Sequence, residues 1–220
     1  MLGQLVNEAG EVYTEADDLL LELFPSASVS TYREEFAEIL ATLESRRTVG
    51  LAYPANYAVE EGTARLLYGI VRAGKPDHIW ETGVANGVSS FIMLNALERN
   101  GSGTLHSTDI ASDVGALVHP EEREAWDLHV IDRTKAAGSL LEYARGLPPL
   151  DLFIHDSLHT FRWQTAELGV AAERLRPGGL MASDDVDASY AFADFCRSHE
   201  LAPLLLMDRR KFFGIVRYSP

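Results

Sequence analysis

The chain has 220 residues, of which 46% are hydrophobic and 24% are charged, and this suits one globular domain with a sizeable core. Its formal net charge of −14 disfavours binding to nucleic acid or to an anionic membrane surface, because surplus Lys and Arg would be needed to displace phosphate counterions. The one cysteine, Cys196, allows no internal disulfide and is interpreted as a small buried hydrophobe. With no basic leader and no apolar run of about 20 residues, we expect a soluble, cytoplasmic protein that acts on a small molecule.

The first 50 residues are predicted to be helical. Apolar residues recur at helical spacing from Leu2 to about Phe24, and the pattern Thr31-x-x-Glu34 is typical of a capping box that starts a second helix. We interpret residues 1–50 as a lid or an oligomer-forming segment, so a homo-oligomer is expected, and residues 51–220 as the main domain. Plain packing of both helices onto a sheet is the alternative.

The loop that follows contains two tyrosines and leads into a third helix. Asn56 is placed to cap this helix, which ends at Gly74. A loop just before the helix that feeds the first strand can close over a ligand. Tyr53 and Tyr57 are therefore candidates to line a pocket.

The centre of the chain reads as strand, glycine turn and helix, the first βα unit of a nucleotide-binding sheet. The strand signal 78–80 is followed by the turn Gly83-x-x-x-Gly87, and Ser89 opens an apolar helix. Glycines are needed where the backbone closely approaches a ligand. The helix N-terminus offers free N–H groups to a carboxylate or phosphate.

Two acidic residues indicate which ligand fits this unit. Asp109 ends the next strand signal, where a doubly wound fold holds a ribose diol. Glu81 precedes the turn and would repel a pyrophosphate, and the third glycine of the dinucleotide fingerprint is missing. A ligand with a ribose and a positively charged amine therefore fits better than a nicotinamide dinucleotide.

Strand and helix signals alternate along the rest of the chain. Further strands are predicted at residues 104–109, 126–131, 150–155, 180–183, 202–207 and 212–218, and helices at 139–145, 161–175 and 188–199, with weak helical character at 112–123. The alternation predicts an α/β fold: a doubly wound, mostly parallel seven-stranded sheet that ends in an antiparallel hairpin. The basic turn of this hairpin, Arg209-Arg210-Lys211, is interpreted as solvated.

Acidic residues gather at the strand ends, where such sheets bind their ligands. They are Glu81, Asp109, Asp132, Asp156, Asp184 and Asp185. Asp156 follows the fourth predicted strand and Asp184-Asp185 the fifth, so a hard divalent ion such as Mg²⁺ is expected if these strands are neighbours. A helix cap is the alternative for Asp184-Asp185. His159, which titrates near neutral pH, is a candidate general base.

These motifs resemble those of the class I S-adenosylmethionine-dependent methyltransferases. The stretch Glu81-Thr82-Gly83-Val84-Ala85-Asn86-Gly87-Val88-Ser89 is similar to their first motif, Arg176-Pro177-Gly178-Gly179 to the turn before their fifth strand, and Phe212-Phe213-Gly214-Ile215-Val216 to their closing hairpin. Asp156-x-x-His159 with Asp184-Asp185 is similar to the Mg²⁺-dependent O-methyltransferases of the catechol, caffeoyl-CoA and macrolide-sugar types. The resemblance covers about residues 79–218.

The resemblance implies a role for each of these positions. Glu81 and the turn with Gly83, Asn86 and Gly87 would hold the methionine part of S-adenosylmethionine, with Ser89 near its carboxylate, Asp109 on the ribose and Asp132 on the adenine amino group. Asp156, Asp184 and Asp185 would bind the metal. His159, where catechol enzymes have a lysine base and some macrolide sugar enzymes a histidine, would take the proton. Apart from the resemblance, the loops that contain Tyr53, Tyr57 and Tyr190 make these residues candidates to border the acceptor pocket.

The implied activity is metal-assisted transfer of a methyl group to a hydroxyl of a small molecule, such as a natural product or a sugar, by a methyltransferase domain of residues 51–220. Coordination to the metal would lower the pKa of the hydroxyl. A metal-independent methyltransferase, with Asp184-Asp185 purely structural, is one alternative. A non-catalytic cofactor-binding subunit, with the N-terminal helices as its partner surface, is the other.

Overall fold

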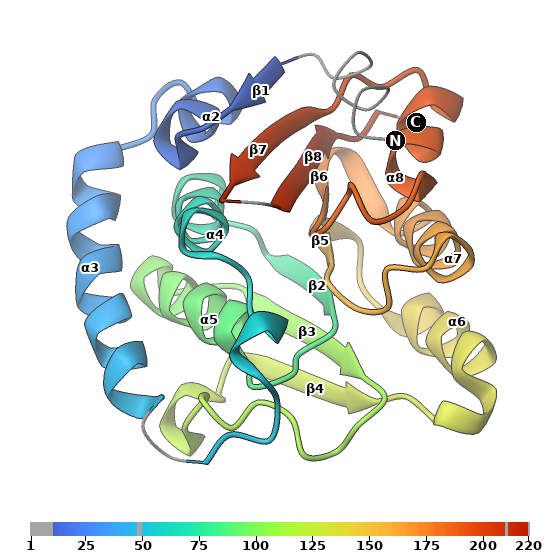
Figure 1. Cartoon of the computed structure of the whole chain (residues 1–220), viewed down its shortest axis with the longest axis horizontal. Coiled ribbons are helices and arrows are strands. Elements are labelled where there is room, and N and C mark those ends of the chain that lie inside the picture. The colour runs from blue at the N-terminus through green and yellow to red at the C-terminus, as the bar shows by residue number, and fades with distance from the viewer. Residues whose placement is uncertain (1–10, 48–49, 210, 220) are drawn as a thin grey trace.

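The computed structural model describes residues 11–47, 50–209 and 211–219, and in this part of the chain it shows an eight-stranded sheet with helices on both faces (Figure 1). The strands are β1 (Glu11–Tyr13), β2 (His78–Thr82), β3 (Thr104–Asp109), β4 (Trp126–Val130), β5 (Leu150–His155), β6 (Leu175–Ser183), β7 (Leu204–Asp208) and β8 (Lys211–Arg217). The α-helices are α2 (Ala16–Leu23), α3 (Val29–Arg46), α4 (Glu61–Gly74), α5 (Val88–Asn100), α6 (Ala136–Gly146), α7 (Phe161–Ala172) and α8 (Ala191–Ser198). Short 3₁₀ turns are η1 (Ala55–Tyr57), η2 (Pro120–Glu122) and η3 (Arg133–Lys135).

The strands are ordered β1-β7-β8-β6-β5-β2-β3-β4 across the sheet. β2 pairs in parallel with β3 on one side and with β5 on the other, while β8 runs antiparallel to β6 and β7. The chain builds outward from β2 to β4 and then returns to β5 on the opposite side of β2. Ligands of doubly wound sheets bind at such a switch point. The predicted fold class is confirmed.

The core lies on both faces of the sheet because successive residues of a buried strand point to opposite sides. Ile79 belongs to the cluster under α2, α3, α4 and α5, whereas Trp80 belongs to the cluster under α6, α7 and α8. The Trp80 ring packs against Phe153 of the neighbouring strand, with 4.9 Å between ring centroids. Figure 1 shows the two groups of helices on opposite sides of the strands.

The N-terminal helices are packed into the first of these clusters. Leu19 and Leu20 of α2 and Phe36 and Leu43 of α3 are all buried there. Residues 11–47 therefore add to the core of the sheet domain. Their role as a lid or oligomer-forming segment, and the boundary at residue 50, stay predictions.

Three N-terminal predictions are wrong. The long first helix begins only at Ala16, because Val12 lies in β1. This strand pairs in parallel with β7 and adds an eighth strand outside the hairpin. The part of that helix predicted at residues 1–10 lies outside the described residues. The capping box is absent because α3 begins after Ser28, which leaves Thr31 inside the helix. Asn56 lies in η1 and does not cap α4, which begins after Glu60.

Further along the chain, several predicted boundaries differ from the structure. Residues 112–123 form only the short turn η2. The helix predicted to end at residue 175 ends at Ala172, and β6 already begins at Leu175, so residues 176–179 are part of a strand. The last helix starts three residues later than predicted. None of the helices in the described ranges combines the length and apolar character needed to cross a membrane.

Candidate active site

The carboxyl ends of four parallel strands lie together at one edge of the sheet. Thr82 at the end of β2 is in register with Thr108 of β3 on one side and with His155 of β5 on the other. His155 is in turn paired with Ser183 at the end of β6. Asp156 and Asp184, which follow β5 and β6, therefore emerge side by side, as the sequence predicts for neighbouring strands.

The glycine turn after β2 fits tightly against the end of β5. Gly83 has φ +87°, and a Cβ atom there would lie 2.0 Å from the carbonyl oxygen of Asp156. Gly87, with φ +88°, is the N-cap of α5, and its Cβ would lie 2.9 Å from Gly115 Cα. Both positions need glycine because L side chains rarely adopt such a φ and neither site has room for one.

A pocket opens between this turn and η1. It is lined by Tyr57, Ala58, Val59, Gly83, Val84, Ala85, Asn86, Val88, Ser89 and Asp156. Its volume of about 290 Å³ includes space open to solvent, which suits one end of a ligand rather than a whole nucleoside cofactor. The pocket brings together Tyr57, Gly83, Asn86, Ser89 and Asp156 from the predicted site.

Glu81 lies beneath the turn and does not line this pocket. Its carboxylate is fully buried and accepts hydrogen bonds from the hydroxyls of Ser89, Ser90 and Ser107. Burial raises the pKa of Glu81, and the three hydroxyl donors oppose that rise. Glu81 thus ties β2 to α5 and β3, and its predicted contact with the cofactor amine stays a prediction.

The two acids predicted to bind the nucleoside are engaged with backbone groups. Asp109 Oδ2 accepts hydrogen bonds from the amides of Val84 (2.9 Å) and Ala85 (3.4 Å), and so holds the glycine turn in shape. Asp132 is exposed and caps η3, where its Oδ1 accepts from the Thr134 amide at 2.9 Å. The Thr134 hydroxyl and amide lower the pKa of Asp132.

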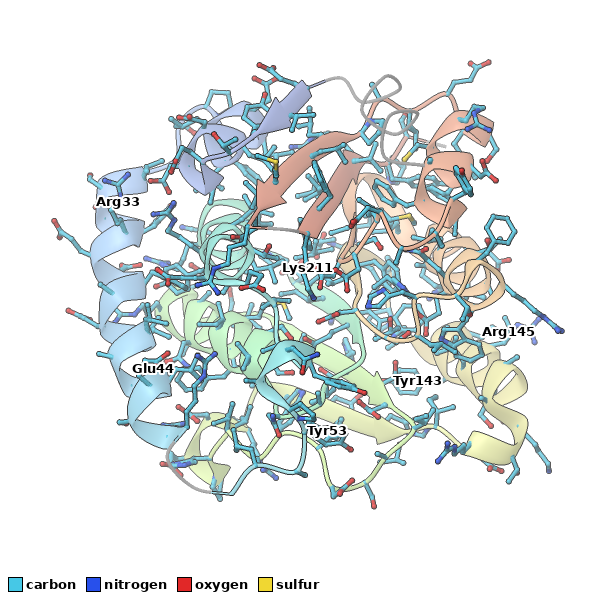
Figure 2. The ribbon with its side chains drawn as sticks, in the orientation of Figure 1. Arg33, Glu44, Tyr53, Tyr143, Arg145 and Lys211 are labelled. Carbon is cyan, nitrogen blue, oxygen red and sulfur yellow. The ribbon has the colours of Figure 1, made fainter. Side chains whose placement is uncertain are left out.

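The tyrosine loop is fastened to the turn through Asn86. The Asn86 side chain accepts from the Tyr53 amide (3.1 Å) and donates to the Tyr53 carbonyl (2.7 Å). The Tyr53 hydroxyl donates to Asp113 Oδ1 at 3.0 Å, in the loop after β3. Figure 2 shows Tyr53 close to η1. Tyr190 lies elsewhere, at the N-terminus of α8, and is partly exposed.

The second group of predicted residues forms a half-buried acidic cluster with a histidine. His159 Nε2 lies 3.8 Å from Asp156 Oδ1 and 3.6 Å from Asp185 Oδ2. Burial lowers the pKa of His159 to about 4, and the neighbouring His155 adds to this effect. Burial raises the pKa of Asp184 to about 6, helped by Asp185. Burial, followed by the charge of Asp184, also raises the pKa of Asp156 well above its ordinary value.

Lys211, interpreted from the sequence as a solvated residue, lies inside this cluster, so that interpretation is wrong for it. Its Nζ is 3.2 Å from Asp185 Oδ2 and 3.7 Å from Asp184 Oδ2, and its side chain is 28% exposed. Burial alone would lower the pKa of Lys211, but Asp184 and Asp185 raise it. Figure 2 shows Lys211 near the middle of the molecule, at the β7–β8 hairpin. Arg209 pairs with Glu60, and Arg210 lies outside the described residues.

A buried hydrogen-bonded pair beneath the cluster was also missed. Glu167 Oε2 lies 2.5 Å from His155 Nδ1, and it accepts hydrogen bonds from the hydroxyls of Thr82 (2.7 Å) and Ser157 (2.9 Å). The only sequence signal is a Glu on the buried face of a helix, at a position usually apolar.

Comparison with known proteins shows what the central part of the chain is similar to. Residues 80–186 match a family model described as a methyltransferase domain. This part of the chain therefore resembles a methyltransferase domain. No curated protein sequence matches the chain.

The chain also has the fold of solved methyltransferases. A putative O-methyltransferase from Klebsiella pneumoniae matches with a TM-score of 0.62 at 18% identity, over 94% of this chain and 98% of that one. An O-methyltransferase from Bacillus cereus, in complex with SAH, matches with a TM-score of 0.59 at 16% identity, over 84% and 91%. MycE from the mycinamycin biosynthetic pathway, solved with Mg, SAH and mycinamycin VI, matches with a TM-score of 0.50 at 16% identity, over 64% and 44%. The predicted resemblance to class I methyltransferases is thus confirmed.

The residues of the site fit one predicted ligand better than the other. The turn at Gly83 is a cradle that a Cβ atom would fill, beside the amide-rich start of α5, and this suits the amino-acid end of S-adenosylmethionine. The acidic cluster, by contrast, already contains a cation. Within residues 11–47, 50–209 and 211–219, no three Asp, Glu, His or Cys side chains are arranged to hold a metal ion.

Proposed function

We propose that the protein transfers a methyl group from S-adenosylmethionine to a hydroxyl group of a small molecule. The observation that carries the proposal is that one pocket joins the glycine turn to the acidic cluster: Gly83, Ser89 and Asp156 line it together. A cofactor seated at the turn would therefore lie next to the cluster that contains His159. The negative cluster also suits the positive charge of a sulfonium cofactor.

Residues of the turn would hold the cofactor. Backbone groups at Gly83 and the start of α5, with Asn86, would bind its methionine part, and Asp109 and Asp132 its nucleoside. When bound, the cofactor supplies an electrophilic methyl group. Holding the acceptor oxygen in line with that methyl group is the main contribution that a protein can make to such a transfer.

His159 is the group proposed to take the proton of the acceptor hydroxyl. Its lowered pKa keeps the imidazole neutral at pH 7, so a nitrogen lone pair is free to accept a proton. Its Nδ1 is buried and has no hydrogen-bond partner within the described residues. Asp156 and Asp185, on the Nε2 side, would stabilise the imidazolium that forms.

Magnesium, predicted from the same carboxylates and present in the MycE structure, does not fit the cluster as it is arranged. The oxygen donors are of the right kind, but the Lys211 ammonium lies among them. No step of the proposed reaction therefore depends on a metal ion. Tyr53, Tyr57 and Tyr190, with the loops around them, would select the acceptor, such as a natural product or a sugar.

Calorimetry with S-adenosylhomocysteine and single-turnover methyl transfer to a panel of phenols, sugars and hydroxylated natural products test this proposal. His159→Gln should bind S-adenosylhomocysteine as tightly as the wild type but transfer methyl about 100-fold or more slowly, because a general base contributes about 10²–10⁴-fold. The matched control is His119→Gln, which changes an exposed histidine remote from the cluster in sequence. Absence of binding, or binding without transfer to any hydroxyl, would overturn the proposal; the second result would favour a non-catalytic subunit.

A further inference from the structure

Lys211 is the one described cation within salt-bridge distance of the acidic cluster. It is the first residue of β8, and Asp208, its partner in register on β7, closes the hairpin on the other side. The hairpin thus places the ammonium next to Asp184 and Asp185, which follow the end of β6. Since β8 also pairs with β6, both partners of this contact are anchored in the same part of the sheet.

The ammonium lies close to the oxygens that a metal ion would have to bind. Lys211 Nζ is 3.7 Å from Asp184 Oδ2 and 3.2 Å from Asp185 Oδ2. An ion such as Mg²⁺ sits about 2.0–2.1 Å from each carboxylate oxygen that it binds, so an ion on Asp185 Oδ2 would lie within about 5 Å of this ammonium. The two cations would repel each other strongly at such a separation.

We propose that Lys211 is the built-in counter-ion of this active site, that it takes the position a divalent ion would need, and that it makes methyl transfer independent of metal. The inference deepens the proposed function, on which it rests for the location of the acceptor. Lys211 neutralises part of the charge of three carboxylates, so that the cluster tolerates burial. With its ammonium close to Asp185 and therefore to His159, it also offers N–H donors to an acceptor oxygen.

Three carboxylates, those of Asp156, Asp184 and Asp185, are opposed by this single ammonium, which leaves an excess of negative charge in the cluster. A positively charged sulfonium cofactor would reduce that excess further.

Binding of Mn²⁺ alone, followed by electron paramagnetic resonance and calorimetry without cofactor or acceptor, tests the proposal. Lys211→Met removes the ammonium but keeps an apolar chain of similar length, and it should bind Mn²⁺ at least 10-fold more tightly than the wild type. Lys211→Arg, which keeps the charge, and Lys135→Met, which removes an exposed lysine of η3, should bind it as weakly as the wild type. Wild-type methyl transfer should be unchanged by EDTA.

Two results would overturn the proposal. One is Mn²⁺ binding by the wild type as tight as, or tighter than, binding by Lys211→Met. The other is loss of wild-type methyl transfer in EDTA with recovery on adding Mg²⁺. This second test uses only the wild type, so it does not depend on whether a variant folds. Neither result would affect binding of S-adenosylhomocysteine or the loss of transfer in His159→Gln, so failure of this inference and failure of the proposed function are distinguishable.

Discussion

Glu167 Oε2 lies 2.5 Å from His155 Nδ1, and both side chains are buried at the junction of α7 with β5. The His155 ring stands edge-on to the ring of His159, at 86° and with 5.2 Å between centroids. A carboxylate on the helix thus fixes a histidine on the strand, and that histidine forms one wall of the site of the proposed base.

Glu167→Gln should lower the free energy of unfolding by about 1–3 kcal/mol, because a buried charge-assisted hydrogen bond becomes a neutral one. Urea unfolding at pH 7 measures the change. Glu173→Gln, one residue beyond the end of the same helix and exposed, should differ from the wild type by less than about 0.5 kcal/mol. Equal stability of the Glu167 variant and the wild type would show that the pair contributes nothing.

Gly83→Ala should abolish cofactor binding and destabilise the domain by about 2 kcal/mol or more, because the new Cβ would clash with the backbone of Asp156 at a positive φ. Thermal unfolding and calorimetry with S-adenosylhomocysteine measure both effects. Gly169→Ala is the matched control: it lies in α7 with nothing near its Cβ position, and it should stabilise the protein by about 0.5–1 kcal/mol. Normal cofactor affinity in Gly83→Ala would exclude the turn as the binding site.

Asp184→Asn should stabilise the protein at pH 7 but not at pH 4. The folded protein holds the proton of Asp184 more tightly than the unfolded chain, since burial raises the pKa to about 6, so the ionised carboxylate destabilises the fold increasingly between about pH 4 and pH 6. The variant lacks this penalty, which is at most about 3 kcal/mol. Chemical unfolding of both proteins at several pH values gives the difference.

Asp194→Asn, at a half-exposed position on α8 where the carboxylate pairs with Arg197, should show no such pH dependence relative to the wild type. A difference between Asp184→Asn and the wild type that stays constant from pH 4 to pH 7 would contradict the assignment.

Glu35→Gln should loosen α3 from α4. The Arg72 guanidinium donates to both Glu35 oxygens and the Tyr68 hydroxyl to one of them, at 2.7–3.1 Å, and Arg72 holds the pKa of Glu35 below its usual range despite its burial. We expect a loss of about 1–2 kcal/mol, with faster hydrogen exchange in α3. The control is Glu34→Gln, which changes the exposed side chain next to Glu35 in sequence and should leave both measurements unchanged.

Much of the sheet could be predicted because each central strand carries a signal of its own. β2 and β5 are short apolar runs between breakers, β4 alternates apolar and polar residues, and the acids at the strand ends mark the ligand edge. β1 could not be predicted in this way, because a three-residue strand is shorter than any periodic signal, and Val12 and Tyr13 also fit a helical period. Its pairing with β7 depends on contacts made almost 200 residues away.

The residues of the site differ in the same way, between those with a local sequence signal and those brought together only by the fold. Asp156 and His159, and likewise Asp184 and Asp185, were visible because each pair is close in sequence. Lys211 was not, because only the hairpin brings it to β6, and no spacing rule connects a basic turn with acids 26 residues earlier. One signal would have identified Lys211. It is a charged residue at the start of a strand, where that strand is predicted to pair with another strand that ends in acidic residues.

The two hydrogen bonds between Asn86 and the backbone of Tyr53 hold the glycine turn and the loop before α4 together. A movement of the turn on binding the methyl donor would therefore move the backbone of Tyr53 as well. The entrance for the second substrate would then be shaped by whether the first is present, which favours an ordered sequence of arrival. Initial-rate and product-inhibition kinetics would reveal that order.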